Sequence, residues 1–191
     1  MRKRFVIVHG WDGSPEAGWF PWLGHELEAL DCDVIVPQLP FPAEPRIDRW
    51  VPALANAVGV VDEQTFFIGY SMGCQTIARF LAGLPQDQIS GGVVFVAGFF
   101  TKLTNLEDDD VVRDVAKEWL ETSLDFSLVR AHIKKSVAIF SDNDQYVPLE
   151  NKEVFVNEIG SRVIIEHDRG HFSGSQGVTE VPSVLDACLE S

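Results

Sequence analysis

The sequence predicts an α/β fold: a doubly wound, six-stranded parallel sheet with helices on both faces. Short runs rich in β-branched and aromatic residues alternate along the chain with amphipathic stretches of helical period. The short runs are apolar throughout, which is typical of strands covered on both faces. The length of 191 residues suits one domain, so we expect residues 1–191 to fold as a single unit.

These patterns predict strands and helices that alternate in chain order. Strands are expected at residues 5–8, 34–36, 66–68, 93–96, 137–140 and 163–165. Between them, apolar residues recur at spacings of three and four, the period of a helix that buries one side. Helices are expected at residues 19–30, 47–58, 72–84, 108–120, 149–157 and 181–189. Right-handed crossovers through such helices make the strands parallel and place ligands beyond their carboxyl ends.

Two segments differ from the rest in composition. Residues 37–45 are rich in proline, which predicts a stiff ordered loop or a surface strap. The acidic run at residues 107–110 precedes a helix with several apolar positions. The simplest interpretation is a solvated helix start, where the helix dipole favours carboxylates. Those apolar positions could instead cover the strand ends, so we expect at most a minimal lid.

Charge and cysteine content argue against several functional classes. The 29 acidic and 15 basic residues leave a net charge of −14, which repels nucleic acids and anionic membranes. The 3 cysteines are widely spaced, form neither a disulfide framework nor a zinc cluster, and favour a reducing compartment. The first apolar run is too short for a signal peptide, and no segment is long enough for a membrane span. We therefore expect a cytoplasmic protein that binds neither nucleic acid nor membrane.

A nucleophile motif follows the third predicted strand. Gly69-Tyr70-Ser71-Met72-Gly73 has the spacing Gly-x-Ser-x-Gly and stands between a strand and a helix, as a nucleophile elbow requires. The sharp turn exposes the Ser71 hydroxyl, and the flanking glycines allow close approach of neighbouring backbone. The Met72 amide faces the same site and can stabilise an oxyanion. Ser71 is therefore the predicted nucleophile.

A serine hydroxyl needs a base, and the base needs an acid that orients it. Asp144 follows the fifth predicted strand and His171 the sixth, so both reach the sheet edge where Ser71 lies. Asp142 competes with Asp144 in the same loop, but its place directly after the strand suits a turn-capping role. His167 competes with His171 and is expected to end the strand facing solvent. We predict a triad of Ser71, Asp144 and His171.

The loop after the first strand supplies the second oxyanion donor in enzymes with this elbow. Here that loop is residues 9–14, His-Gly-Trp-Asp-Gly-Ser, and the Trp11 amide is the expected donor beside Met72. His9 is expected to pack or hydrogen-bond beneath the loop, outside the chemistry. Because the glycine spacing of a dinucleotide site and the ligand spacing of a metal site are both missing, we expect no cofactor and no metal.

Several separated motifs together point to a known family. They are His9-Gly-Trp-Asp-Gly-Ser14, Trp19-Phe-Pro-Trp-Leu23, Pro40-x-Pro42-x-x-Pro45-Arg46-x-x-Arg49-Trp50, Gly69-Tyr-Ser-Met-Gly-Cys74, Ser141-x-x-Asp144-x-x-Val147-Pro148 and Gly170-His-Phe172. Nearly from end to end, this set resembles the YdeN-like hydrolases which, together with the retinoblastoma-binding protein nine type, are compact α/β-hydrolases. The resemblance implies a serine hydrolase with Ser71, Asp144 and His171 as triad, six parallel strands and no cofactor.

The expected reaction is carboxylesterase-like hydrolysis of small esters or activated amides, through an acyl-enzyme on Ser71. We expect Trp11, Trp19, Phe99 and Phe100 to wall the substrate crevice, which favours a modest apolar or aromatic group. One alternative is a non-catalytic protein that binds a partner through the crevice or the proline-rich segment. Another is an acyltransferase or aminopeptidase-like enzyme with the same nucleophile. No protein partner is predicted.

Overall fold

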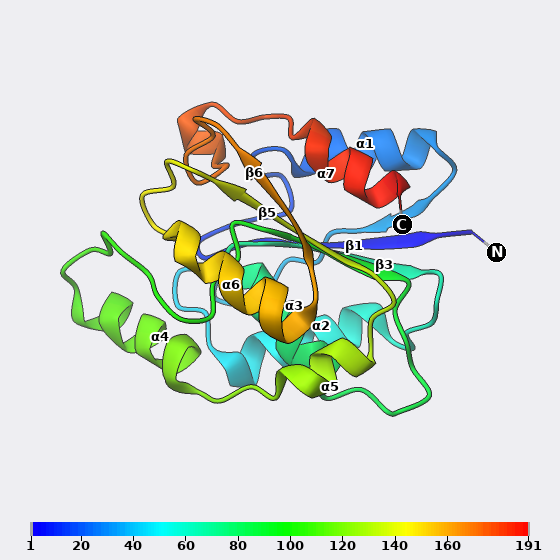
Figure 1. Cartoon of the computed structure of the whole chain (residues 1–191), viewed down its shortest axis with the longest axis horizontal. Coiled ribbons are helices and arrows are strands. Elements are labelled where there is room, and N and C mark those ends of the chain that lie inside the picture. Colours follow the sequence, from blue (N-terminus) through cyan, green and yellow to red (C-terminus); the bar gives the residue numbers. More distant parts are fainter. Residues whose placement is uncertain (1, 191) are drawn as a thin grey trace.

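One six-stranded parallel sheet forms the centre of the molecule, which confirms the predicted doubly wound α/β fold (Figure 1). The computed structural model describes residues 2–190. The strands pair in the order β2-β1-β3-β4-β5-β6, every neighbouring pair in parallel. Their bounds are β1 (Arg4–Val8), β2 (Asp33–Ile35), β3 (Thr65–Tyr70), β4 (Gly92–Val96), β5 (Ser136–Ser141) and β6 (Arg162–Glu166).

Helices lie on both faces of this sheet, as its apolar strands require. In Figure 1, the first and the last helix lie together above the sheet and the others lie below it. The helices are α1 (Phe20–Ala29), α2 (Ile47–Val58), α3 (Met72–Ala82), α4 (Asp110–Glu121), α5 (Phe126–Ala131), α6 (Lys152–Val154) and α7 (Pro182–Leu189). Their right-handed crossovers bring the ends of all six strands to one edge of the sheet.

The alternation of side chains along β1 explains why the molecule has two hydrophobic cores. Phe5 and Ile7 point into the core under α1 and α7, whereas Val6 and Val8 point into the core under the other helices. All four side chains are buried. A strand that is apolar on both faces thus holds two helical layers together.

Three details differ from the elements predicted by the sequence. The short helix α5 was not predicted, because six residues span too few turns to show a period. Residues 149–159 are a 3-10 turn, one α-helical turn and a π-helical turn in succession instead of one α-helix. The edge strands β2 and β6 are only half-buried, so the prediction of coverage on both faces holds for the four central strands alone.

The loops that follow the strands form the end of the molecule where the predicted site residues gather. Ser71 follows β3, Asp144 follows β5 and His171 follows β6. Within residues 2–190, no helix is long and apolar enough to cross a lipid bilayer.

Candidate active site

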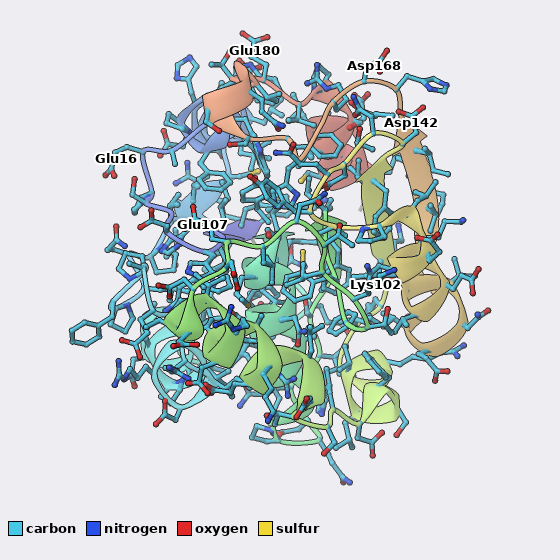
Figure 2. All side chains as sticks on the ribbon, turned by 90° about the vertical axis from the view of Figure 1, so that its left-hand side faces the viewer. Glu16, Lys102, Glu107, Asp142, Asp168 and Glu180 are labelled. Carbon is cyan, nitrogen blue, oxygen red and sulfur yellow. The ribbon has the colours of Figure 1, made fainter. Side chains whose placement is uncertain are left out.

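A cavity of about 760 Å³ opens at the carboxyl ends of the strands. Ser71, Met72, His171 and Trp11 all line it. The loops at this end of the molecule, which faces the viewer in Figure 2, also carry exposed charged side chains. The labelled ones are Glu16, Lys102, Glu107, Asp142, Asp168 and Glu180. Five of these six side chains are carboxylates.

Ser71 lies at a strained turn between β3 and α3. Its backbone has φ 52° and ψ −118°, a conformation that is unfavourable for any side chain larger than glycine. Two contacts hold the turn: the Ser71 amide donates to the Val96 carbonyl at 2.8 Å, and the Cys74 amide donates to the Ser71 carbonyl at 3.0 Å. The Ser71 side chain consequently stands at the floor of the cavity, at the N-terminal end of α3.

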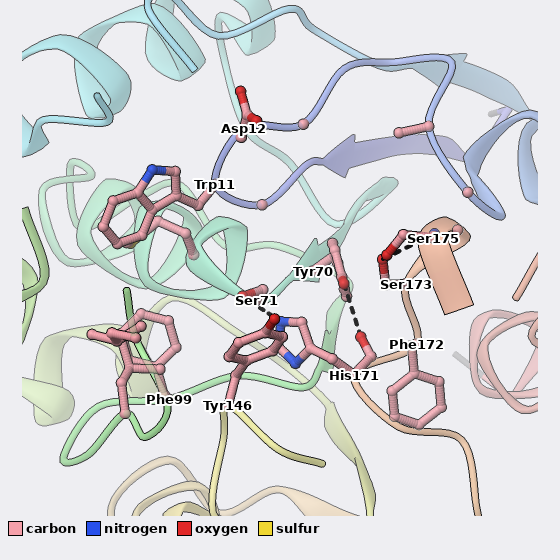
Figure 3. A pocket seen from close by; sticks show the side chains of 18 of the residues that line it. Trp11, Asp12, Tyr70, Ser71, Phe99, Tyr146, His171, Phe172, Ser173 and Ser175 are labelled. Atoms are coloured by element: carbon pink, nitrogen blue, oxygen red, sulfur yellow. Dashed lines mark hydrogen bonds between the residues drawn. The ribbon is translucent and has the colours of Figure 1, made fainter. Parts of the chain in front are cut away.

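Ser71, His171 and Asp144 form one chain of hydrogen bonds, and Figure 3 shows the bond between Ser71 and His171. Asp144 Oδ2 lies 2.7 Å from His171 Nδ1, and His171 Nε2 lies 3.0 Å from Ser71 Oγ. A carboxylate can only accept, so Nδ1 carries the hydrogen and Nε2 is the free acceptor for the Ser71 hydroxyl. The side chain of Asp144 is only 2% exposed, which shields this pair from water.

The two competing aspartates occupy distinct positions. Asp144 contacts His171 through Oδ2, while its Oδ1 accepts from the amides of Tyr146 and Val147 at 2.8 and 3.0 Å. Asp144 therefore makes the turn-capping contacts that the sequence suggested for Asp142.

Asp142 instead accepts from the Asp168 amide and contacts the exposed ring of His167. These two contacts, the amide first, lower the pKa of Asp142 below its usual range. His167 faces solvent, as predicted, and is not among the described residues that line the cavity.

His171 is held in place from several sides by residues that the sequence did not single out. The Tyr70 hydroxyl donates to the His171 carbonyl at 2.8 Å, and the Gln176 side chain accepts from the His171 amide at 2.8 Å. The rings of Tyr70 and Tyr146 each lie with their centroids 5.3 Å from the imidazole. Tyr70 could have been suspected from its place inside the elbow motif, whereas nothing local to Gln176 marks it.

The loop after β1 approaches the elbow closely. A Cβ atom at Gly10 would lie 3.1 Å from the Cβ of Ser71, so a larger residue would push the loop away. Beneath the loop, His9 is fully buried; its Nδ1 contacts the Gly10 carbonyl at 2.8 Å and its Nε2 accepts from the Leu39 amide at 3.0 Å. The predicted place of His9 beneath the loop is thus confirmed.

These contacts make the stability of the protein depend on the protonation of His9. Burial lowers the pKa of His9 below 6.5, and the bond to the Gly10 carbonyl opposes this only in part. The unfolded chain therefore binds a proton more readily than the folded one, so this stabilisation is present above about pH 6.5 and is lost as the pH falls through the folded pKa.

We expect the free energy of unfolding of the wild type to fall more steeply than that of His9→Gln between pH 7.5 and pH 5. Urea denaturation at both pH values measures this difference. Parallel pH dependences of the two proteins would contradict the lowered pKa of His9.

Three of the four aromatic residues predicted for the crevice line the cavity. These are Trp11, Trp19 and Phe99. Phe100 is not among the described residues that line the cavity, and its ring packs in the core against Phe126 and Phe155 at centroid distances of 5.0 and 4.9 Å. Adjacent residues that follow a strand point in different directions, and the sequence does not tell which one faces the cavity.

The cavity wall combines aromatic side chains with negative charge. Asp12 and Glu107 are its charged lining residues within the described part of the chain, and neither lysine nor arginine lines it there. Leu103 and Val112, the latter from α4, also line it, so residues on both sides of the acidic run at 107–110 form part of the cavity wall. Within residues 2–190, no three potential ligand side chains are grouped to hold a metal ion.

Comparisons with known proteins find similar sequences and structures that match almost the whole chain. The sequence profile described as serine hydrolase matches residues 5–190. The chain is 30% identical to YdeN of Bacillus subtilis (strain 168) over 186 residues, which cover 97% of this chain and 94% of that protein. It is 21% identical to the serine hydrolase RBBP9 of Rattus norvegicus over 174 residues, 90% and 88% of the two chains. The crystal structure of the Bacillus subtilis ydeN gene product matches with a TM-score of 0.89 and 28% identity, over 98% of this chain and 97% of that one.

Proposed function

This chain belongs to the serine hydrolase family, and from that premise we propose that it is a carboxylesterase-like enzyme acting on small esters or activated amides through an acyl-enzyme on Ser71. The observation that carries the proposal is the hydrogen-bonded chain from Ser71 through His171 to Asp144. Nucleophile, base and orienting acid each have the contact that their role requires.

In the first half-reaction, Ser71 Oγ attacks the acyl carbon while its proton passes to His171 Nε2. Asp144 holds the Nδ1–H and stabilises the imidazolium that forms. The tetrahedral intermediate collapses, the ester C–O bond breaks, and the leaving alcohol takes the proton from His171. Water then attacks the acyl-enzyme in the same way, His171 again removes a proton, and Ser71 leaves with it.

Negative charge develops on the carbonyl oxygen of the substrate in both half-reactions. The proposed donors to this oxygen are the main-chain amides of Trp11 and Met72, which belong to the two segments that meet at Gly10 and Ser71. The positive end of the α3 dipole adds to the same stabilisation.

The preferred substrate is an uncharged ester with a modest apolar or aromatic group. Trp11, Trp19 and Phe99 supply apolar wall, while Asp12 and Glu107 repel a carboxylate or phosphate. A neutral aryl acetate such as p-nitrophenyl acetate should therefore be turned over faster than a dicarboxylic half-ester of similar size.

Covalent labelling tests the proposed nucleophile. A fluorophosphonate probe is expected to label the wild type at Ser71, and Ser71→Ala is expected to lose all labelling, because an activated serine hydroxyl displaces fluoride from the probe and forms a phosphonate ester. Intact mass spectrometry and peptide mapping of the adduct measure this. The serine side chain is small, so both proteins should unfold at similar temperatures.

Two results would count against the enzyme. Undiminished labelling of Ser71→Ala would assign the nucleophile elsewhere. A wild type that is neither labelled nor active on any of a panel of short esters would instead favour the non-catalytic binding protein.

A further inference from the structure

The proline-rich segment, residues 37–45, lies against the oxyanion loop, residues 9–14, and we refer to it as the proline strap. Proline has no N–H, so this segment cannot pair as a strand would, and its carbonyl groups need donors from elsewhere in the molecule. Phe41, at the turn of the strap, has a φ of 49°, and its ring is 67% exposed beneath the Arg49 guanidinium. Contacts to the rest of the protein must therefore fix the path of the strap.

Three tryptophan side chains supply such contacts. Each donates its indole N–H to a different strap carbonyl: Trp50 to Pro40 at 2.9 Å, Trp11 to Ala43 at 3.0 Å and Trp119 to Pro45 at 3.0 Å. Trp119 lies on α4 and Trp50 on α2, so two of these bonds anchor the strap to the helical layer. The bond from Trp11 instead joins the strap to the oxyanion loop.

Two more hydrogen bonds join the same two segments. The Asp12 amide donates to the Pro42 carbonyl at 2.7 Å, and the Leu39 amide donates to His9 Nε2 at 3.0 Å. The Asp12 amide is part of the Trp11–Asp12 peptide unit and the indole is the side chain of Trp11, so both bonds act directly on Trp11, while His9 holds the start of the loop. The main-chain direction at Trp11 is thereby fixed by a segment that is itself anchored to α2 and α4.

We propose that the proline strap positions the oxyanion hole, with His9 and the Trp11 indole as the positioning groups that fasten the loop to it. The inference rests on the proposed function, in which the Trp11 main-chain N–H is an oxyanion donor. A donor displaced by a fraction of an ångström stabilises the transition state less, while the bound ester is little affected. Loss of the fastening should lower kcat more than it changes KM.

The first test compares two indoles that bond to the same strap. Trp11→Phe removes the hydrogen bond from the oxyanion loop to the Ala43 carbonyl of the strap and keeps an aromatic ring in the cavity wall. Trp119→Phe removes an equivalent bond, to the Pro45 carbonyl at the far end of the strap. For p-nitrophenyl acetate we expect Trp11→Phe to lose about tenfold to a hundredfold in kcat with KM changed by less than about threefold. Trp119→Phe should lower Tm but keep kcat within about twofold of the wild type, because Trp50 still holds the Pro40 carbonyl and Glu118 of α4 still accepts from the Ile47 amide just beyond the strap.

The second test uses two variants of His9, each with a side-chain amide that can replace one of the two ring nitrogens. The glutamine side chain of His9→Gln can present its oxygen near the position of Nε2 and accept from the Leu39 amide. The asparagine side chain of His9→Asn is too short and reaches only the position of Nδ1. We therefore expect His9→Asn to lose at least about tenfold in kcat and His9→Gln to recover most of this loss. Amide hydrogen exchange at residues 10–13 should be faster in Trp11→Phe and His9→Asn, but not in Trp119→Phe.

The outcomes separate this inference from the proposed function. Ser71-dependent turnover by the wild type, together with full kcat in Trp11→Phe, would overturn the inference alone. Equal losses of kcat in Trp11→Phe and Trp119→Phe, or in both His9 variants, would also overturn it, because they would indicate a general structural role. A wild type without Ser71-dependent turnover would overturn the proposed function and the inference with it.

Discussion

Replacement of His171 by alanine is expected to lower kcat for p-nitrophenyl acetate by at least about 10⁴-fold. Without the imidazole, the Ser71 hydroxyl has no acceptor for its proton, and the leaving alcohol has no donor. Two hydrogen bonds that place residue 171, from Tyr70 and Gln176, are to its main chain, and these remain in the variant. The loss should therefore appear in the steady-state kcat and in the rate of acylation, with little change in Tm.

His167→Ala is the matched control for this experiment. His167 also stands beside an aspartate in the neighbouring loop, but its side chain is 88% exposed and outside the cavity. An exposed pair of this kind contributes little to stability. Because His167 lies outside the cavity, we expect the kcat of His167→Ala to stay within about twofold of the wild type. Comparable losses in the two variants, or a His171→Ala variant with more than about a tenth of the wild-type kcat, would contradict the assigned base.

Replacement of Gly73 by alanine is expected to destabilise the folded protein by about 3 kcal/mol or more. A Cβ atom at this position of α3 would lie 2.2 Å from the Val8 carbonyl oxygen and 2.7 Å from that of His9. Both contacts are with the backbone of β1 and the residue after it, which cannot move aside as a side chain can. The helix would have to leave the sheet, and Ser71 would move with it. Urea denaturation at neutral pH measures the free energy of unfolding.

Gly24→Ala is the control variant, in which alanine replaces a helical glycine without a steric clash. Gly24 lies inside α1, and a Cβ there would have the Val34 side chain as its nearest neighbour at 3.8 Å, an ordinary contact. Because alanine favours the helix, we expect this variant to be more stable than the wild type by about 0.5–1 kcal/mol. If Gly73→Ala were destabilised no more than a typical surface variant, the close approach of α3 to β1 would be wrong.

Much of the fold could be predicted because the local signals agree with the global arrangement. Apart from polar residues at their ends, the strands β1, β3, β4 and β5 are apolar, and this pattern suits a sheet covered on both sides. The short helix α5 could not be predicted, since its place is set by packing of Val129 into the core and by the Asp125 cap. The position of Phe100 depends on how the chain turns after β4, where Ala97 has a φ of 48°.

The candidate site was predictable to the extent that each residue follows a strand in a recognisable motif. Ser71, Asp144 and His171 each have such a position, and parallel strands bring them to one edge. The supporting contacts were not predictable, because they join distant segments without any local pattern. The Tyr70 hydroxyl, for example, reaches a carbonyl 101 residues further along the chain, and the Trp119 indole reaches one 74 residues before it.

The long separation between nucleophile and base has a consequence for biosynthesis. Ser71 and His171 lie 100 residues apart, and the segment that carries His171 follows the last strand of the sheet. On the ribosome, the serine is synthesised well before its proton acceptor, so a nascent chain that ends before β6 carries only an ordinary alcohol. Under the proposed mechanism, the chain becomes catalytically active only after residue 171 has been synthesised and the sheet is complete. Reactivity toward a fluorophosphonate should therefore distinguish full-length molecules from truncated translation products.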